Sequence, residues 1–208
     1  MTDMHQAAIT IVGLGPGRLA DVTLEVHKLF TQAAQKSLTI YFRTIIHPTV
    51  EPLKQDIPNL RIESFDRLYD ESDDWSALYQ QLAEEVCALA TQQPIIYAVP
   101  GHPLVGDMSV VQVLEMAVQR GLTTRIVSGL SFIEPVCNLL KLDIIESGIQ
   151  MIDATNLVAL SPDEIAGKLI PTQPLLIAHV YNRRLASAVK LALGECYNDD
   201  WNVKLVKT

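Results

Sequence analysis

Short apolar runs and segments of helical periodicity alternate along the first two thirds of the chain. The runs predict strands at residues 9–12, 37–42, 60–65, 95–99 and 123–127. Between and after them, apolar residues recur at the spacing of a helix face, which predicts helices over residues 22–33, 78–89, 110–118 and 130–140. In the third of these helices we expect the inward side chains to be Val110, Val111, Leu114 and Val118. Strand, helix and strand in succession are typical of a parallel α/β sheet, so we predict an α/β fold.

The alternation of short apolar runs and helical segments changes around residues 142–148. Beyond this point the pattern predicts strands at residues 149–153, 156–160, 175–180 and 202–206, and helices over residues 162–169 and 184–193. We therefore predict two domains. The first is an N-terminal α/β domain with a parallel sheet over residues 1–142, and the second is a smaller, mixed α/β domain over residues 143–208.

Composition and charge narrow the classes of function. The chain has 208 residues, of which 49% are hydrophobic and 19% charged, as in a globular protein. Its apolar runs are far shorter than the roughly 20 residues that cross a bilayer, and its start does not have the pattern of a signal peptide. The net charge of −8 disfavours nucleic acid and anionic membranes as partners. We expect a cytoplasmic protein that acts on a small molecule.

The metal-binding residue types are scattered. Cys87, Cys137 and Cys196 form no C-x-x-C pair, and the five histidines form no H-E-x-x-H motif. We therefore expect free thiols and no metal site.

A glycine-rich loop, G-L-G-P-G at residues 13–17, follows the first predicted strand. Dinucleotide-binding folds keep their phosphate loop at this place, but Arg18 stands where the third glycine of G-x-G-x-x-G belongs. Pro16 also lacks an N–H that could bind phosphate. A tight turn between strand and helix is therefore a simpler interpretation than phosphate binding.

Two further loops follow predicted strands at the edge where open α/β sheets bind ligands. In the loop at residues 100–103, Pro100 and Pro103 fix the backbone, while Gly101 allows close approach and His102 offers an imidazole. This pattern favours a ligand cradle, and the alternative is a rigid turn with a solvated histidine. In the next loop Ser131 is not a nucleophile elbow, because the second glycine of G-x-S-x-G is missing, and helix capping explains it.

Together the three loops resemble those of the tetrapyrrole (corrin/porphyrin) methylase family. The G-x-G-P-G motif of that family matches residues 13–17, and its P-G-[IV]-[ST]-[ST] motif is matched by S-G-L-S-F at residues 128–132. Its second loop, usually G-D-P, is matched by residues 101–103 with His102 in place of aspartate. Residues 97–105 and 181–191 look like the methylase-like domain at the N-terminus of MazG fusion proteins. On this likeness we expect the native chain to continue past Thr208 into a MazG pyrophosphohydrolase domain.

The resemblance implies a two-domain methyltransferase that binds S-adenosylmethionine in the cleft between its domains, usually as a homodimer. Carried over by position, the cofactor contacts are Pro16, Pro100, Gly101, His102, Val105, Ser131, Phe132 and His179. No catalytic residue is implied.

The methyl acceptor is open. A tetrapyrrole with acidic side chains would need cations at the cleft, and the candidates are Arg18, Arg43, Arg183 and Arg184. One alternative is a non-catalytic module that senses S-adenosylmethionine or a nucleotide and regulates a fused MazG domain. A second is methylation of RNA or of a modified protein residue.

Overall fold

The computed structural model describes residues 7–71 and 74–207 of the chain. They form two compact units, of which the first ends at Glu134 and the second runs from Pro135 to Lys207. The division that we predict, after residue 142, falls just beyond the helix α6, which spans Ile133–Leu140.

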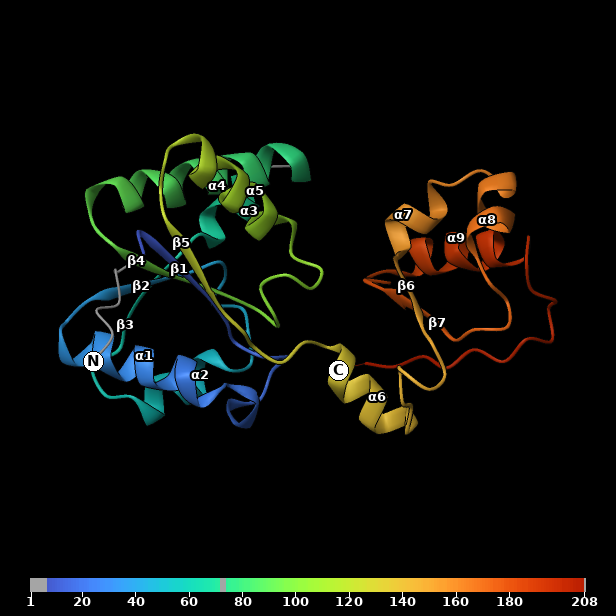
Figure 1. Ribbon diagram of the computed structural model, residues 1–208, viewed down its shortest axis with the longest axis horizontal. Helices are drawn as coiled ribbons and strands as arrows, with labels where there is room; N and C mark the ends of the chain where they lie inside the picture. The colour runs from blue at the N-terminus through green and yellow to red at the C-terminus, as the bar shows by residue number, and fades with distance from the viewer. Residues whose placement is uncertain (1–6, 72–73, 208) are drawn as a thin grey trace. The chain divides into compact units, whose positions relative to one another are not determined.

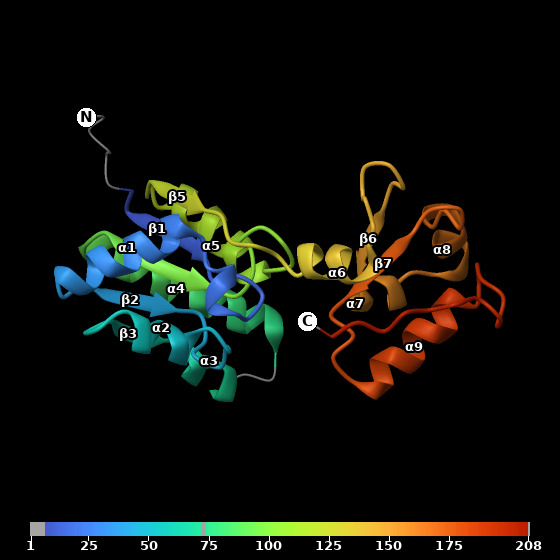
Figure 2. The ribbon, with the colours of Figure 1, turned by 90° about the horizontal axis from the view of Figure 1, so that it is seen from below.

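The first unit is built on a parallel sheet of five strands. The strands are β1 (Ile9–Gly13), β2 (Thr39–Phe42), β3 (Arg61–Ser64), β4 (Ile95–Val99) and β5 (Thr124–Val127). Their order across the sheet is β3-β2-β4-β1-β5. Figure 2 shows β5, β1, β2 and β3 from top to bottom, which is the reverse of this order. All five strands predicted for this part of the chain are confirmed.

Helices cover both faces of this sheet (Figure 1). The short 3-10 helix at Leu19–Asp21, α1 (Leu24–Gln35) and α2 (Val50–Asp56) follow β1 and β2, and α1 and α2 cover one face. The opposite face is covered by α3 (Asp66–Glu71), α4 (Trp75–Gln92) and α5 (Met108–Gln119). Alternate residues of β1 serve the two layers, because Ile11 packs in the core under α4 and α5 and Val12 packs in the core under α1 and α2.

The connections place a switch point at the carboxyl edge of the sheet. Strands β1 and β4 are neighbours, but the chain leaves β1 for α1 on one face and leaves β4 for α5 on the other. In open α/β sheets ligands bind outside the carboxyl ends of two strands that diverge in this way.

The second unit has a sheet of two parallel strands, β6 (Gln150–Asp153) and β7 (Leu175–Ala178). Three helices accompany it: α7 (Ala154–Val158), α8 (Pro162–Lys168) and α9 (Arg183–Leu193). Its core is small and is formed by Ala154, Leu157, Ile165, Leu169, Leu185 and Val189.

Three expectations from the sequence are wrong. Residues 156–160 are not a strand, because Asp153 caps the helix α7 and Leu157 packs in the helical core. Residues 202–206 form no strand, since no neighbouring strand hydrogen-bonds to them in the part of the chain that is described. Val118 does not face the core of the first unit; it is 79% exposed, and the inward face of α5 carries Val110, Val113 and Ala117 instead.

In the described parts of the chain, no helix combines the length and apolar character that a membrane span requires.

Candidate functional site

The loops after β1, β4 and β5 meet at the carboxyl edge through three glycines. A Cβ atom built on Gly13 would lie 2.7 Å from the backbone nitrogen of Gly129 and would clash with the carbonyl oxygen of Gly101. A Cβ atom on Gly129 would clash with the same oxygen and with the backbone of Gly13. The three loops therefore pack backbone against backbone, which only glycine permits at these two positions.

The first two loops are also joined by hydrogen bonds. The N–H of Gly15 donates to the carbonyl of Gly101 at 3.2 Å, and the N–H of Gly101 donates to the carbonyl of Gly15 at 2.9 Å. Both residues have left-handed backbones, with φ of 76° and 66°. The N–H of Gly15 thus serves the contact between the loops, which agrees with a tight turn rather than a phosphate loop at residues 13–17.

Arg18, which stands at the third glycine position, is tied to Asp21. Its guanidinium donates to both carboxylate oxygens, at 2.6 and 3.0 Å. The hydrogen bond from Arg18 is the main reason that the pKa of Asp21 lies below its usual value. Arg18 therefore fastens the end of the first loop.

Gly101 and His102 are half-buried in the second loop. The Nδ1 atom of His102 accepts a hydrogen bond from the N–H of Leu104 at 3.1 Å, so in the neutral ring the proton lies on Nε2. A Cβ atom on Gly101 would meet no atom within 4 Å. The backbone of Gly101 is consequently open to a ligand on one side, and the imidazole next to it can donate a hydrogen bond.

Ser131 is buried and serves the start of α6, as the capping interpretation predicts. Its N–H and its hydroxyl both donate to Oε2 of Glu134 at 2.7 Å, and its hydroxyl accepts from the N–H of Ile133. Burial raises the pKa of Glu134, but the hydrogen bonds from Ser131 and the nearby His102 outweigh it, and the pKa lies below its usual value. Ser131 is thus held by a charged carboxylate and is not set up as a nucleophile.

A buried ion pair, which the sequence analysis missed, fixes the far end of the second loop. Arg43 donates to Oδ2 of Asp107 at 2.7 Å, and Oδ1 of Asp107 accepts from the N–H and the hydroxyl of Ser109 at the start of α5. Burial would lower the pKa of Arg43, but Asp107 outweighs it and the guanidinium stays charged. The sequence did contain one signal of this ion pair, because Arg43 directly follows the apolar residues of β2, at the edge of the sheet where a charge needs a partner.

Seven of the eight predicted cofactor residues lie in the three loops of the first unit. Pro16 is in the first loop, Pro100, Gly101, His102 and Val105 are in the second, and Ser131 and Phe132 are in the third. The eighth, His179, follows β7 in the second unit, where its Nδ1 lies 2.7 Å from Oδ2 of Asp153.

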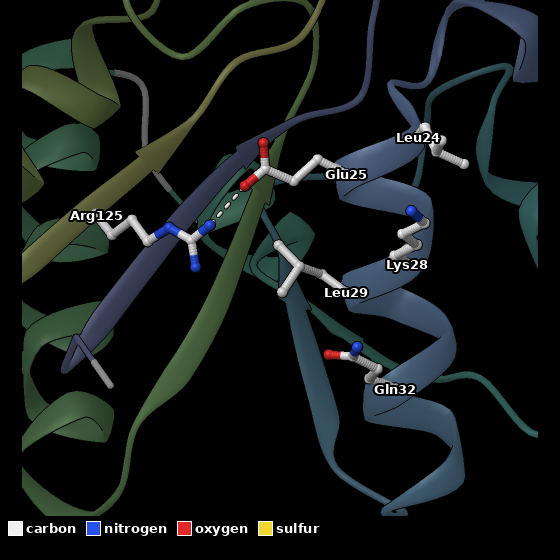
Figure 3. Close-up of a pocket in the computed structure, with 6 residues that line it drawn as sticks. All are labelled: Leu24, Glu25, Lys28, Leu29, Gln32 and Arg125. Atoms are coloured by element: carbon white, nitrogen blue, oxygen red, sulfur yellow. Dashed lines mark hydrogen bonds and ion pairs between the residues drawn. The ribbon is translucent and has the colours of Figure 1, made fainter. Parts of the chain in front are cut away.

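The surface hollow in Figure 3 lies elsewhere, along α1 and β5 of the first unit. Glu25 and Arg125 form an ion pair across it, and the other lining residues are Leu24, Lys28, Leu29 and Gln32. None of the predicted cofactor residues lines it. No group of three or more metal-ligating side chains could hold a metal ion within residues 7–71 and 74–207.

A parallel sheet with a switch point and three interlocked loops defines an α/β protein of the open-sheet class, in which ligands bind at the carboxyl edge. The chain belongs to the family described as Tetrapyrrole (Corrin/Porphyrin) Methylases, which it matches over residues 8–207.

One relative is the "Uncharacterized protein YabN" of Bacillus subtilis (strain 168). It is 36% identical over 198 residues, which make up 95% of this chain and 38% of that protein. The chain therefore spans less than two fifths of the length of this relative.

Two solved structures resemble the chain in fold. A diphthine synthase has a TM-score of 0.59 at 17% identity, covering 90% of this chain and 71% of that one. A uroporphyrin-III-C-methyltransferase from Thermus thermophilus has a TM-score of 0.50 at 17% identity, covering 73% and 62%. The predicted α/β fold of the family is confirmed.

Proposed function

We propose that the protein is a methyltransferase that binds S-adenosylmethionine at the three loops of the carboxyl edge. The observation that carries this proposal is the junction of Gly13, Gly101 and Gly129 at the switch point, with the backbone of Gly101 open beside it. Membership of the methylase family and the names of the two similar structures support the reaction type.

The residues present fit this cofactor. The space beside the backbone of Gly101 is open, since a Cβ atom there would meet no atom within 4 Å, and His102 can donate from Nε2 to a hydroxyl or carbonyl oxygen. We assign the contacts to Pro16, Pro100, Gly101, His102, Val105, Ser131 and Phe132, and to His179 from the second domain. S-adenosylmethionine supplies the methyl group and its own leaving group.

The chemical demands on the chain itself are therefore modest. Its residues orient the two reactants and exclude water, which is where a site of this kind gains most of its rate. Ser131 is committed to Glu134, and Arg43 to Asp107, so these groups hold the loops in place. This assignment explains why the loops need no nucleophile of their own.

The acceptor that we propose is a small molecule, and a tetrapyrrole is the first candidate because of the family. Arg18 and Arg43 already bind Asp21 and Asp107, so only their other N–H groups could bind acidic side chains of such a substrate. Arg183 and Arg184 begin α9 and are exposed.

The alternative function is a module that binds the same cofactor, transfers nothing and regulates a fused MazG pyrophosphohydrolase. One observation favours it: the chain accounts for only 38% of its relative from Bacillus subtilis, so that relative has room for another domain. We also propose that the protein is cytoplasmic and that it forms a homodimer. Sedimentation of the purified chain checks the second of these two proposals.

Calorimetric titration with S-adenosylmethionine, S-adenosylhomocysteine and ATP tests the proposal. We expect the two sulfur ligands to bind with micromolar dissociation constants, about −8 kcal/mol, and ATP to bind far more weakly. Release of S-adenosylhomocysteine in the presence of a tetrapyrrole would favour the enzyme, and binding without turnover across acceptors would favour the module. Tight binding of ATP alone would overturn the proposed function.

A further inference from the structure

The loop after β2, residues 43–48, lies beside the first two loops of the candidate site. The backbone N–H of Arg43 donates to a carbonyl of β4 at 2.8 Å, and the side chain of Arg43 reaches Asp107 at the end of the second loop. At the other end, the ring of Pro48 borders the first loop, since a Cβ atom on Gly17 would lie 3.6 Å from it. The loop after β2 is therefore a fourth loop at the carboxyl edge, and it lies entirely within the first unit.

Asp107 uses only part of the Arg43 guanidinium. The ion pair is made by Nη1 of Arg43, which lies 2.7 Å from Oδ2 of Asp107. The Nε atom of Arg43 is buried and makes no hydrogen bond of normal geometry with the described residues. Nε and Nη2 form the planar edge that can bind two oxygens of one carboxylate or phosphate. Because the side chain of Arg43 is 21% exposed, a ligand can reach part of it from solvent.

Tyr69 supplies a second donor close to Arg43. Its hydroxyl is buried and, in the parts of the chain that the structure describes, it also makes no hydrogen bond of normal geometry. Burial raises the pKa of Tyr69 and the charge of Arg43 opposes this shift only in part, so the phenol keeps its proton at neutral pH. A buried donor without a partner destabilises the folded state, and a ligand that accepts from it removes this cost.

His47 adds a third donor from the same loop. Its Nδ1 atom accepts from the N–H of Thr49 at 3.4 Å, so in the neutral ring the proton lies on Nε2. Burial and the charge of Arg43 both lower the pKa of His47, which keeps the ring neutral at pH 7. Arg43, His47 and Tyr69, here called the donor cluster, are thus complementary to an oxygen atom that carries negative charge.

The two carboxylates of this region already hold backbone in place. Oδ1 of Asp107 accepts from the N–H of Ser109 at the start of α5 at 3.0 Å. Asp66 accepts from the N–H of Ile45 at 2.9 Å and from the hydroxyl of Thr44. The groups left to a ligand are therefore mainly donors.

We propose that the donor cluster binds an oxyanion group, a carboxylate or a phosphate, of the methyl acceptor. The assignment of this group to the acceptor rests on the proposed function, whereas the binding of an oxyanion rests on the donors alone. The same loop exposes Ile45 and Ile46, at 44% and 84%, and an apolar part of the acceptor can lie against them. A small molecule with an apolar body and an acidic group is the substrate class that this surface fits.

Titration of inorganic phosphate and, separately, of succinate into the full chain tests the proposal. Nitrogen NMR of the isotope-labelled arginine Nε–H groups reports the binding, and the signal that is lost in Arg43→Lys belongs to Arg43. We expect this signal to shift with a millimolar dissociation constant. A response to phosphate alone indicates a phosphorylated acceptor, and a response to succinate alone indicates a carboxylic acid. No response to either anion would overturn the inference.

Tyr69→Phe separates a ligand site from a structural one. The variant removes only a hydroxyl that lacks a partner among the described residues, so we expect the urea midpoint of unfolding to stay the same or rise. The dissociation constant of the anion should rise about tenfold. Tyr197→Phe, at a half-buried tyrosine of the second unit, is the matched control and should not change it. Unchanged affinity in Tyr69→Phe, or a lower urea midpoint, would mean that the hydroxyl serves no ligand and would overturn the inference.

S-adenosylhomocysteine separates the inference from the proposed function, because it carries a carboxylate of its own. We expect the anion to bind with the same dissociation constant when S-adenosylhomocysteine is saturating. Displacement of the anion would assign the donor cluster to the cofactor and overturn its role toward the acceptor. If S-adenosylhomocysteine binds and neither anion does, only the inference fails. If S-adenosylhomocysteine does not bind, the proposed function fails, and the assignment to an acceptor fails with it.

Discussion

Ser131 and Glu134 illustrate how single residues hold the site together. The two hydrogen bonds that Ser131 donates end on one carboxylate oxygen, and they keep the pKa of Glu134 below its usual value. Since the folded state prefers the charged form, this stabilisation is complete above the ordinary pKa of glutamate. It disappears as the pH falls through the lowered pKa of the folded protein.

We therefore predict that Glu134→Gln lowers the free energy of unfolding at pH 7 by about 0.5 kcal/mol, a value reduced for solvent screening. The difference from the unaltered chain should shrink as the pH falls below the ordinary pKa of glutamate, about 4.3, and vanish below the lowered pKa of the folded protein. Urea unfolding at pH 7 and pH 3.5 measures it, with the exposed Glu115→Gln as a control. A difference that is the same at both pH values would contradict the role of the charge.

Arg43 gives a second prediction at this scale. Asp107 is almost fully buried, and replacing Arg43 with methionine would leave its carboxylate without a counter-charge. Removal of one partner of a buried pair is strongly destabilising, so we expect a loss of about 3 kcal/mol in the free energy of unfolding. Arg61→Met, at an exposed position on β3, should cost less than about 0.5 kcal/mol. Equal losses in the free energy of unfolding for the two variants would contradict the stabilising role of the ion pair between Arg43 and Asp107.

At the scale of elements, β1, β2 and β4 were predictable because each is a largely buried apolar run that ends at or before a glycine, proline or polar residue. The signal of β3 was weaker, because its residues are alternately exposed and half-buried. The run at residues 156–160 was misread, since five apolar-rich residues fit a strand and a short helix equally well. Asp153, three residues upstream, was the capping signal that would have distinguished them. The predicted strand at residues 202–206 had suitable alternation, but a strand also needs a partner, which a local pattern does not report.

The candidate site was predictable only in part, because a local sequence pattern does not report which distant residues become neighbours in the folded chain. Pro16, Gly101 and Ser131 belong to loops that stand out as motifs in the sequence. The pairs Arg43–Asp107 and Asp153–His179 join residues 64 and 26 positions apart, and only the strand order brings them together.

The close packing of the loops after β1, β4 and β5 leads to a prediction at the scale of elements. Gly129→Ala should lower the free energy of unfolding by about 3 kcal/mol, because the new methyl group would meet the backbones of two other loops. Gly167→Ala is the matched control, since a methyl group there meets no atom within 4 Å and lies on the helix α8. That variant should gain up to about 1 kcal/mol. An unchanged stability of Gly129→Ala would contradict the close packing of the loops.

At the scale of the whole molecule, the first unit holds the complete five-stranded sheet and both of its cores. We predict that a fragment of residues 1–142 folds without the rest of the chain, which circular dichroism and thermal unfolding measure. Because the proposed cofactor site also takes His179 from the second domain, the fragment should bind S-adenosylmethionine at least about 100-fold more weakly, a loss of about 2.7 kcal/mol. Undiminished affinity of a folded fragment would restrict the site to the first domain.

The central claim is that the backbone of Gly101 lies against the cofactor, and two glycine variants test it most directly. Gly101 and Gly121 both have left-handed backbones, with φ of 66° and 65°, and an added Cβ atom meets nothing within 4 Å at either one. Alanine therefore introduces the same strain, about 1 kcal/mol, at both positions. Gly121 lies beyond the end of α5, and Gly101 lies in the loop after β4.

Calorimetric titration of S-adenosylmethionine into the unaltered chain, Gly101→Ala and Gly121→Ala is the measurement. We expect micromolar binding to the unaltered chain and to Gly121→Ala, and affinity at least about tenfold weaker for Gly101→Ala. Equal affinity of all three proteins would contradict the claim, as would the absence of binding to the unaltered chain at millimolar cofactor.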